Sequence, residues 1–250
     1  MMPLACLRSF IAACLAGWLC SAAALAETAS VAVAANFTQV AEQLAPVFKA
    51  RTGHELVFSF GSTGQLFNQI SQGAPFEVLL AADDVRPAKA VAEGFAVGGT
   101  AFTYAVGELA LYSTSLDVSD GQAVLGQGAF DKLAIADPAT APYGAAALQT
   151  IEALGLGVAL TPKLVTGENI TQTLQFVESG NAELGFVAAS QVVGKASVWL
   201  VPSELHQPIR QDAVLLKTGE RNPAAVAFLT FLKSEEAKDL IRAAGYSVEP

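Results

Sequence analysis

The fold of this chain is decided by residues 30–49, which read SVAVAANFTQVAEQLAPVFK. Ser30 to Ala34 is a short run of small and β-branched residues, which is typical of a buried strand. From Phe37 to Lys49, apolar residues recur at i, i+4, i+7 and i+8, on one face of a helix: Val40, Leu44, Val47 and Phe48. A strand followed at once by an amphipathic helix is the first half of a βαβ unit and predicts a parallel sheet.

The alternation of strand and helix patterns continues to about residue 93. Glu55 to Phe60 and Val78 to Ala81 have the composition of strands, and Thr63 to Gln72 and Asp84 to Glu93 have helical patterns. Such alternation predicts an α/β fold with a mainly parallel sheet and helices on both faces.

The pattern restarts after a long extended segment, Ala101 to Tyr112. It then predicts strands and helices in turn at residues 133–136, 142–154, 163–165, 170–179 and 184–188. A second extended segment, Gln207 to Lys217, precedes two closing helices, for which Asn222 and Ser234 are the expected N-caps.

Two α/β halves joined by two extended crossings predict two lobes with a ligand cleft between them. We assign residues 27–105 and 214–250 to lobe 1 and residues 106–213 to lobe 2, with hinge crossings near residues 105–107 and 212–214. In open α/β sheets, ligands bind outside the carboxyl ends of the strands. The expected site therefore lies at strand-to-helix junctions that face the cleft.

Residues 1–26 have the pattern of a signal peptide that is removed on export. Arg8 is the only charge before Glu27, Phe10 to Cys20 is apolar, and Ala24-Leu25-Ala26 is a small-x-small cleavage pattern. A membrane anchor is the alternative, but a spanning helix needs about 20 apolar residues, and this run is shorter. We expect a secreted mature chain that begins at Glu27.

Cysteine content and charge limit what the mature chain can be. All 3 cysteines precede Glu27, so a mature chain has no disulfide and depends on core burial for its stability. The sequence has 14 Lys and Arg against 23 Asp and Glu, a formal net charge of −9, with no basic cluster. This acidic balance argues against binding to nucleic acid or to anionic lipid.

Four junctions have a small or neutral polar residue where a helix is expected to begin: Asn36, Ser62, Pro142 and Asn169. Helix N-termini carry N–H groups without acceptors and a partial positive charge. Several such termini that converge on one cleft form an anion site that needs no Lys or Arg. An acidic protein can therefore bind an oxyanion through neutral donors.

Each of these residues also has a purely structural interpretation. Asn36 and Asn169 are ordinary N-caps, and Ser62 with Gln65 matches an S-x-x-Q capping box. Tyr143 is compatible with simple core packing. Asp83 and Asp84 are best explained as a turn and N-cap before the next helix: a pair of catalytic carboxylates is the less favoured explanation.

Enzyme signatures are scarce in the sequence. Gly61-Ser62-Thr63-Gly64 is one residue short of the GxSxG nucleophile elbow, and there is no HExxH, P-loop or GxGxxG motif. His54 and His206 have no evident metal or catalytic partner. We expect no direct metal ligands and no enzymatic activity, with a secreted hydrolase that uses Ser62 and one histidine as the alternative from another class.

Six short motifs in a fixed order resemble the periplasmic molybdate-binding protein family of ABC importers, over residues 30–248. They are Ala34-Ala35-Asn36-Phe37, Gly61-Ser62-Thr63-Gly64, Gly73-Ala74-Pro75-Phe76-Glu77-Val78, Ala81-Ala82-Asp83-Asp84, Ala141-Pro142-Tyr143-Gly144 and Gly167-Glu168-Asn169-Ile170. The resemblance implies a two-lobed periplasmic-binding-protein fold, type II-like, that closes on a tetrahedral oxyanion.

The resemblance also implies a set of ligand-binding residues. Asn36 would donate from its side chain and backbone, at a position where other members carry Ser, and Ser62 from its hydroxyl and backbone N–H. Tyr143 and Ile170 would donate backbone N–H groups from lobe 2. Two neighbours complete the candidate set as additional contacts: Ala35 and Thr63.

The function implied is the capture of molybdate or tungstate in the periplasm and its delivery to an inner-membrane ABC permease. The protein would act as a monomer, with no cofactor and no nucleic-acid partner. Another tetrahedral oxyanion, such as sulfate, phosphate or phosphonate, is the alternative ligand. Phosphate carries a proton at neutral pH, and its sites usually include an acceptor, for which Asp83, Asp84 and Asp137 are near enough to be considered.

One position departs from the family pattern. Some members place a Tyr hydroxyl in the pocket after the G-x-V strand, but here Gly185-Phe186-Val187 leads to Ala188. The missing donor must be replaced by Asn36 or by the hydroxyl of Tyr143. This departure resembles an Asn-containing branch of the family.

Overall fold

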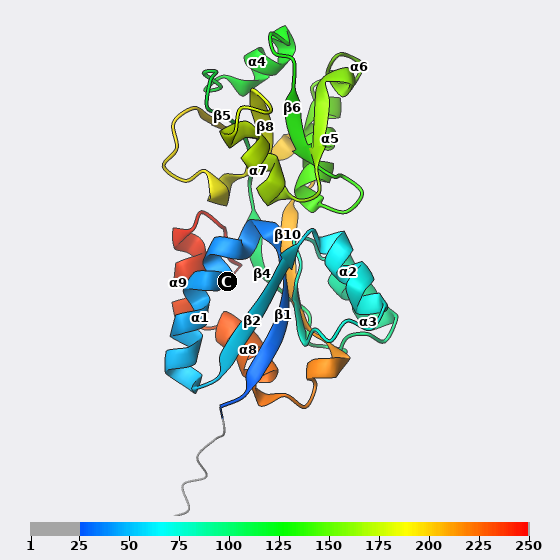
Figure 1. The fold of residues 1–250 in the computed structure, drawn as a ribbon, viewed down its shortest axis with the longest axis vertical. Coiled ribbons are helices and arrows are strands. Elements are labelled where there is room, and N and C mark those ends of the chain that lie inside the picture. The colour runs from blue at the N-terminus through cyan, green and yellow to red at the C-terminus, as the bar shows by residue number, and fades with distance from the viewer. Residues whose placement is uncertain (1–25, 250) are drawn as a thin grey trace, which may run out of the picture.

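Two five-stranded sheets carry the fold, and each has helices on both faces (Figure 1). The computed structural model describes residues 26–249, so the expected signal peptide lies outside the described residues apart from Ala26. We call the sheet that contains the first strand, together with its helices, lobe 1, and the other sheet with its helices lobe 2. No helix in the described range is long and apolar enough to cross a membrane.

Lobe 1 contains a sheet of order β2-β1-β3-β10-β4. β1 pairs in parallel with β2 and β3, whereas β10 runs antiparallel to β3 and β4. The strands are β1 Thr28–Ala34, β2 Glu55–Gly61, β3 Val78–Leu80, β4 Phe102–Gly107 and β10 Ile209–Leu215. The parallel part is the βαβ alternation predicted from the sequence, and the antiparallel strands come from the two extended segments.

Helices cover both faces of the lobe 1 sheet (Figure 1). The helices on one face are α1 Thr38–Thr52, α8 Pro223–Leu232 and α9 Glu235–Ala243, and those on the other are α2 Thr63–Ser71 and α3 Val85–Ala92. Val40, Leu44 and Phe48 of α1 are buried in the core, as their helical spacing predicts. Asn222 and Ser234 cap α8 and α9 through their side chains, which confirms both expected caps.

Lobe 2 has the same plan, with a sheet of order β7-β6-β8-β5-β9. β6 is parallel to β7 and β8, and β5 is antiparallel to β8 and β9. The strands are β5 Leu109–Ser113, β6 Leu133–Ala136, β7 Leu164–Gly167, β8 Leu184–Ala188 and β9 Val198–Leu200. The helices are α4 Gly121–Gln127, α5 Pro142–Ala153, α6 Gly157–Leu160 and α7 Ile170–Glu178. The predicted two-lobed α/β class is confirmed, with sheets that are mixed rather than mainly parallel.

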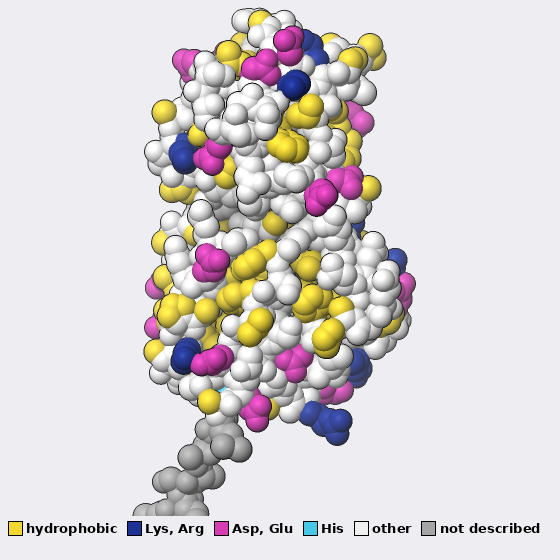
Figure 2. Space-filling model, viewed as in Figure 1, with side chains coloured by type: hydrophobic (Ala, Val, Ile, Leu, Met, Phe, Trp, Pro, Cys, Tyr) yellow, Lys and Arg dark blue, Asp and Glu magenta, His cyan; other side chains and the backbone are white. Residues whose placement is uncertain are grey.

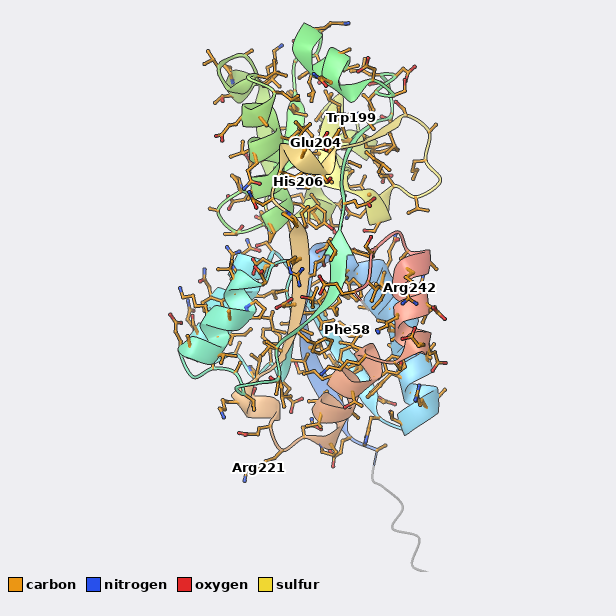
Figure 3. The ribbon with its side chains drawn as sticks, turned by 180° about the vertical axis from the view of Figure 1, so that it is seen from behind. Phe58, Trp199, Glu204, His206, Arg221 and Arg242 are labelled. Atoms are coloured by element: carbon orange, nitrogen blue, oxygen red, sulfur yellow. The ribbon has the colours of Figure 1, made fainter. Side chains whose placement is uncertain are left out.

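The chain passes between the lobes twice, and both crossings lie close together. β4 ends at Gly107 opposite Ile209 of β10, and the two strands run side by side toward lobe 2, as Figure 3 shows from behind. Residues 106–107 and 209–213 therefore pair within the lobe 1 sheet, although the sequence assigned them to lobe 2. The second crossing lies before Ile209 and not at residues 212–214, because the sequence of an extended segment does not reveal which strands it will pair with.

The front of lobe 1 carries a group of exposed hydrophobic side chains. Figure 2 shows them over the region where Figure 1 draws β2. β2 is the edge strand of its sheet, and its Val57 and Phe60 are exposed. This surface lies on the sheet edge, and at Phe60 it reaches the end of β2 that leads into α2.

Candidate functional site

A small pocket lies between the lobes, where strand-to-helix junctions from both sheets meet. Its volume of about 10 Å³ is close to the minimum that one water molecule needs. The six residues named from the sequence all line this pocket: Ala35, Asn36, Ser62, Thr63, Tyr143 and Ile170. The structure therefore brings together residues that lie more than 130 positions apart in the chain. The hydrogen bond from Thr171 Oγ1 to Ala35 O, for example, joins residues 136 positions apart.

Three helix N-termini reach this pocket. α2 begins at Thr63 in lobe 1, and α5 and α7 begin at Pro142 and Ile170 in lobe 2. The N–H groups of a first helical turn have no acceptor inside their own helix, and the helix dipole adds a partial positive charge there. Pro142 has no N–H, so Tyr143 carries the first donor of α5, as its place after an N1 proline predicts.

Ser62 is the residue whose environment most clearly indicates a ligand. It precedes α2 at the N-cap position but makes no side-chain capping bond, so the capping-box interpretation with Gln65 is wrong. Its side chain is 3% exposed, and in residues 26–249 its Oγ is the buried side-chain polar atom without a hydrogen-bond partner. An unpaired buried hydroxyl costs about 1–3 kcal/mol. Such a group is explained when a ligand completes its bonding.

Asn36 is held inside the protein by both of its side-chain amide hydrogens. Its Nδ2 donates to Gln211 Oε1 at 2.9 Å and to the Tyr246 hydroxyl at 3.0 Å. Phe37 is the N-cap of α1, so the structural interpretation of Asn36 as a cap is also wrong. An amide nitrogen has two hydrogens to donate. The side-chain donors that the resemblance assigned to the ligand are thus occupied in this structure, and the Asn36 backbone N–H remains.

Tyr143 is buried, and its hydroxyl points away from the helix start that carries its N–H. The hydroxyl accepts a hydrogen bond from Gln211 Nε2 at 3.1 Å. A Cβ added to Gly107 would lie 2.0 Å from this hydroxyl, which therefore sits against the crossing between the lobes. Burial raises the pKa of Tyr143 well above its usual value, so the hydroxyl keeps its proton at neutral pH.

The N-terminus of α7 is capped in a way that leaves one donor over. Asn169 Oδ1 accepts from the N–H groups of Thr171 and Gln172 at 3.0 and 3.1 Å, which confirms the predicted N-cap. The N–H of Ile170 is the first-turn donor that this cap does not use. Its side chain is buried in the core of lobe 2.

Hydrogen bonds between the lobes surround the pocket and show that they are closed on each other. Thr171 Oγ1 donates to Ala35 O at 3.1 Å, and Gly64 N donates to Thr140 O at 2.8 Å. Arg86 Nη2 donates to Ala139 O at 3.0 Å beside the second of these contacts. Thr63 Oγ1 is occupied within lobe 1, where it accepts from Ala82 N at 3.0 Å.

A larger cavity of about 530 Å³ adjoins the pocket. It is lined by charged side chains of the α3 region, including the ion pair of Asp83 with Arg86, but not by Ser62, Tyr143 or Ile170. Asp83 Oδ1 also accepts from Arg86 N, whereas Asp84, the N-cap residue of α3, makes no side-chain capping bond, so the turn is as predicted and the bond comes from the residue before the N-cap. Since the unpaired hydroxyl and the converging helix starts face the small pocket, that pocket is the candidate site.

Neither histidine is placed to activate Ser62. His54 Nδ1 accepts from Glu27 N at 3.1 Å, and His206 Nδ1 lies 2.8 Å from Gln207 O. Figure 3 shows His206 beside Glu204 in lobe 2. Among residues 26–249 there is no group of three or more His, Cys, Asp or Glu that could hold a metal ion. The geometry therefore offers nothing in support of the serine-hydrolase alternative.

Comparison with known proteins agrees with this geometry. The family model described as bacterial extracellular solute-binding protein matches residues 29–247. The chain belongs to this family. It is 52% identical to the molybdate-binding protein ModA of Rhodobacter capsulatus over 87% of each chain. It is also 52% identical to the molybdate-binding protein ModA of Azotobacter vinelandii, over 94% of this chain and 95% of the relative.

A solved structure shows the same architecture. The Azotobacter vinelandii periplasmic molybdate-binding protein superposes with a TM-score of 0.86 and 37% identity, covering 89% of this chain and 100% of that chain. The resemblance inferred from the six motifs is thus confirmed at the level of family and fold. The two relatives and the solved structure are all named as molybdate-binding proteins.

Sequence reasoning missed two residues that shape the site. Gln211 and Tyr246 hold Asn36 from one strand and from the C-terminal segment, and neither belongs to a recognisable motif. The only sequence signal is weak: Gln211 is one of three consecutive polar residues in β10, and nothing in the sequence shows that it is the fully buried one. A polar side chain in such a place must find buried partners.

The contrast between Ser62 and Asn169 can be tested on the ligand-free protein. Asn169→Ala removes two bonds to backbone N–H groups and should lower the free energy of unfolding by about 0.5–2 kcal/mol. Ser62→Ala removes no bond, so its free energy of unfolding should match the wild-type value or exceed it. Denaturant melts of both variants measure this difference. A loss for Ser62→Ala as large as for Asn169→Ala would mean that Ser62 caps α2 after all.

Proposed function

We propose that the protein captures molybdate or tungstate in the periplasm and delivers it to an inner-membrane ABC importer. The observation that carries the proposal is the buried, unpartnered hydroxyl of Ser62 in a pocket where three helix N-termini converge. The relatives named as molybdate-binding proteins, at 52% identity over most of the chain, support this choice of anion. We propose further that it is exported through residues 1–26 and acts as a monomer without a cofactor.

The donor chemistry of the pocket suits a fully deprotonated oxyanion. No Lys, Arg, Asp or Glu is among its lining residues, so the available groups are backbone N–H donors and the hydroxyls of Ser62 and Thr63. An anion that carries no proton only accepts hydrogen bonds, and this set of donors satisfies it. Phosphate would bring a proton that needs an acceptor. Asp83 faces the larger cavity, and Asp137 accepts from Ala139 N and Thr140 Oγ1.

Capture and release follow from the two-lobed geometry. Donors come from lobe 1 at Ser62 and from lobe 2 at Tyr143 and Ile170, so an anion can use all of them only when the lobes are closed. The anion therefore binds the closed state better than the open state and shifts the population toward it. Opening about the paired crossings then breaks the site in two and lets the anion leave. This cycle needs no chemical step.

Titration calorimetry with molybdate, tungstate, sulfate and phosphate tests the proposal directly. Molybdate and tungstate should bind at least tenfold more tightly than sulfate, a difference of about 1.4 kcal/mol. Added salt should weaken binding little, because no exposed cation provides the attraction. Ser62→Ala should weaken molybdate binding about ten- to a hundredfold, since a hydrogen bond to a charged group contributes about 1.5–3 kcal/mol. Sulfate affinity within tenfold of molybdate would contradict the assignment.

Closure can be tested at Gly64, whose N–H bonds to Thr140 O across the cleft. A Cβ at position 64 would lie 2.9 Å from Thr140 Cα, so Gly64→Ala should keep the lobes apart. Molybdate affinity should fall at least tenfold, while the melting temperature stays the same or rises, because Ala favours a helix over Gly by roughly 0.5–1 kcal/mol. Calorimetry and thermal melts measure the two effects.

Gly126→Ala in α4 is the matched control, since a Cβ there meets nothing within 4 Å. It should gain stability and leave molybdate affinity unchanged. An unchanged affinity in Gly64→Ala as well would show that the closed arrangement of α2 against Thr140 is not the state that holds the anion.

A further inference from the structure

A buried polar group connects the two sides of the cleft behind the pocket. Gln211 lies on β10, close to the point where the chain re-enters lobe 1, and its side chain is fully buried. Its Oε1 accepts from Asn36 Nδ2 at 2.9 Å and from the Tyr104 hydroxyl at 3.1 Å. Its Nε2 donates to the Tyr143 hydroxyl at 3.1 Å. One amide thus contacts a pocket residue from each lobe.

The backbone around Gln211 is shaped to allow these contacts. The pairing of β10 with β4 shifts register between Gln211 and Asp212. A bulge of this kind bends a strand and redirects a side chain, and bulges are frequent beside functional sites. Here Gln211 pairs with Ala105 and Asp212 with Thr103, so Tyr104 of β4 is the extra residue, and its hydroxyl donates to Gln211 Oε1.

Gly107 provides a second, independent indication that the backbone is shaped to fit the contact between Gln211 and Tyr143. A Cβ at residue 107 would lie 2.0 Å from the Tyr143 hydroxyl and 2.6 Å from Gln211 Nε2. Only a residue without a side chain leaves the space in which the hydroxyl and the amide meet. The crossing strand β4 therefore carries its glycine at the position where lobe 2 and β10 come into contact.

The network has no charged member. The Tyr246 hydroxyl accepts from Asn36 Nδ2 at 3.0 Å and from Ser190 Oγ at 2.9 Å, and it donates to Asn36 O at 2.9 Å. Burial raises the pKa of Tyr246 to about 12 and the pKa of Tyr104 well above its usual value. The hydroxyls therefore stay neutral at physiological pH, and the acidic side chains that act on them, Glu108, Asp83 and Asp212, lie outside the hydrogen-bonded network.

We propose that Gln211 is a positioning residue for anion binding, which aligns the lobe 1 and lobe 2 halves of the pocket through its bonds to Asn36 and Tyr143. Asn36 follows the end of β1 and Tyr143 begins α5, so the amide sets the distance between the two backbone segments that carry the donors. This inference rests on the proposed function, because its effect is expressed as affinity for the anion.

The first test replaces the amide by groups of nearly the same volume. Gln211→Met removes all three hydrogen bonds and should weaken molybdate binding at least tenfold. Gln211→Glu keeps an acceptor for Asn36 but brings a negative charge beside the anion at pH 8. Its loss of affinity should be larger, and it should diminish as the pH falls toward 5.5, because a protonated carboxyl again offers one acceptor and one donor.

The pH profile separates positioning from a merely structural role. Burial and the neighbouring anion both raise the pKa of the introduced carboxyl, so its recovery falls within the measured range while wild-type affinity stays level there. Thr103→Val is the matched control. Thr103 Oγ1 donates to Asp212 Oδ1 at 2.7 Å and accepts from Arg210 Nη2 at 3.0 Å, next to Gln211 but outside the pocket. This control should bind molybdate as the wild type does.

A measurement without ligand completes the test. Small-angle scattering of the ligand-free protein should give a larger radius of gyration for Gln211→Met than for the wild type and Thr103→Val. If the wild type binds molybdate, an unchanged affinity in Gln211→Met together with a level pH profile in Gln211→Glu would overturn the role of Gln211. The proposed function would then still stand. If the wild type does not bind molybdate, the proposed function is wrong. In that case, an unchanged radius of gyration in Gln211→Met would also overturn the inference that Gln211 aligns the two lobes.

Discussion

The first turns of α2, α5 and α7 contain N–H groups for which their own helices have no acceptor. The chemistry of the pocket depends on these donors. Each helix would otherwise satisfy these donors with water or a cap. Asn169 caps two of them on α7, and Ser62 stands at the cap position of α2 without capping it. The two sheets hold the three helix starts toward one point, and closure of the lobes removes water from it. Neutral N–H donors in a pocket without water can then bind an anion, as Lys and Arg side chains do at an exposed site.

This arrangement explains how a chain with a formal net charge of −9 can hold an anion. Lysine or arginine in the pocket would attract many anions and would bind them with strong salt dependence. Fixed backbone donors would instead select an anion by the positions of its oxygens, so the choice of ligand would depend on geometry. The buried tyrosines and Gln211 extend the same principle behind the pocket, where a neutral network supports Asn36 and Tyr143.

The features predicted correctly from the sequence are those that depend on near neighbours in the chain. The helical spacing of Val40, Leu44 and Phe48 identified their buried face, and Asn169, Asn222 and Ser234 cap the helices that follow them. The partners of Asn36 could not be predicted in this way, because Gln211 lies 175 positions away and Tyr246 lies 210 positions away. The place of the second crossing was missed for the same reason, since pairing of β10 with β3 and β4 is a tertiary choice.

The buried hydroxyl of Ser62 also has a consequence for how a membrane partner would distinguish loaded from empty binding protein. Without an anion, the closed state leaves this group unpaired, at about 1–3 kcal/mol, which makes closed empty molecules rarer by roughly 5- to 150-fold. A membrane partner that recognises the closed shape would then meet loaded carriers far more often than empty ones. If Ser62 binds the anion as proposed, the same hydroxyl would also make the closed shape a signal that the protein is loaded.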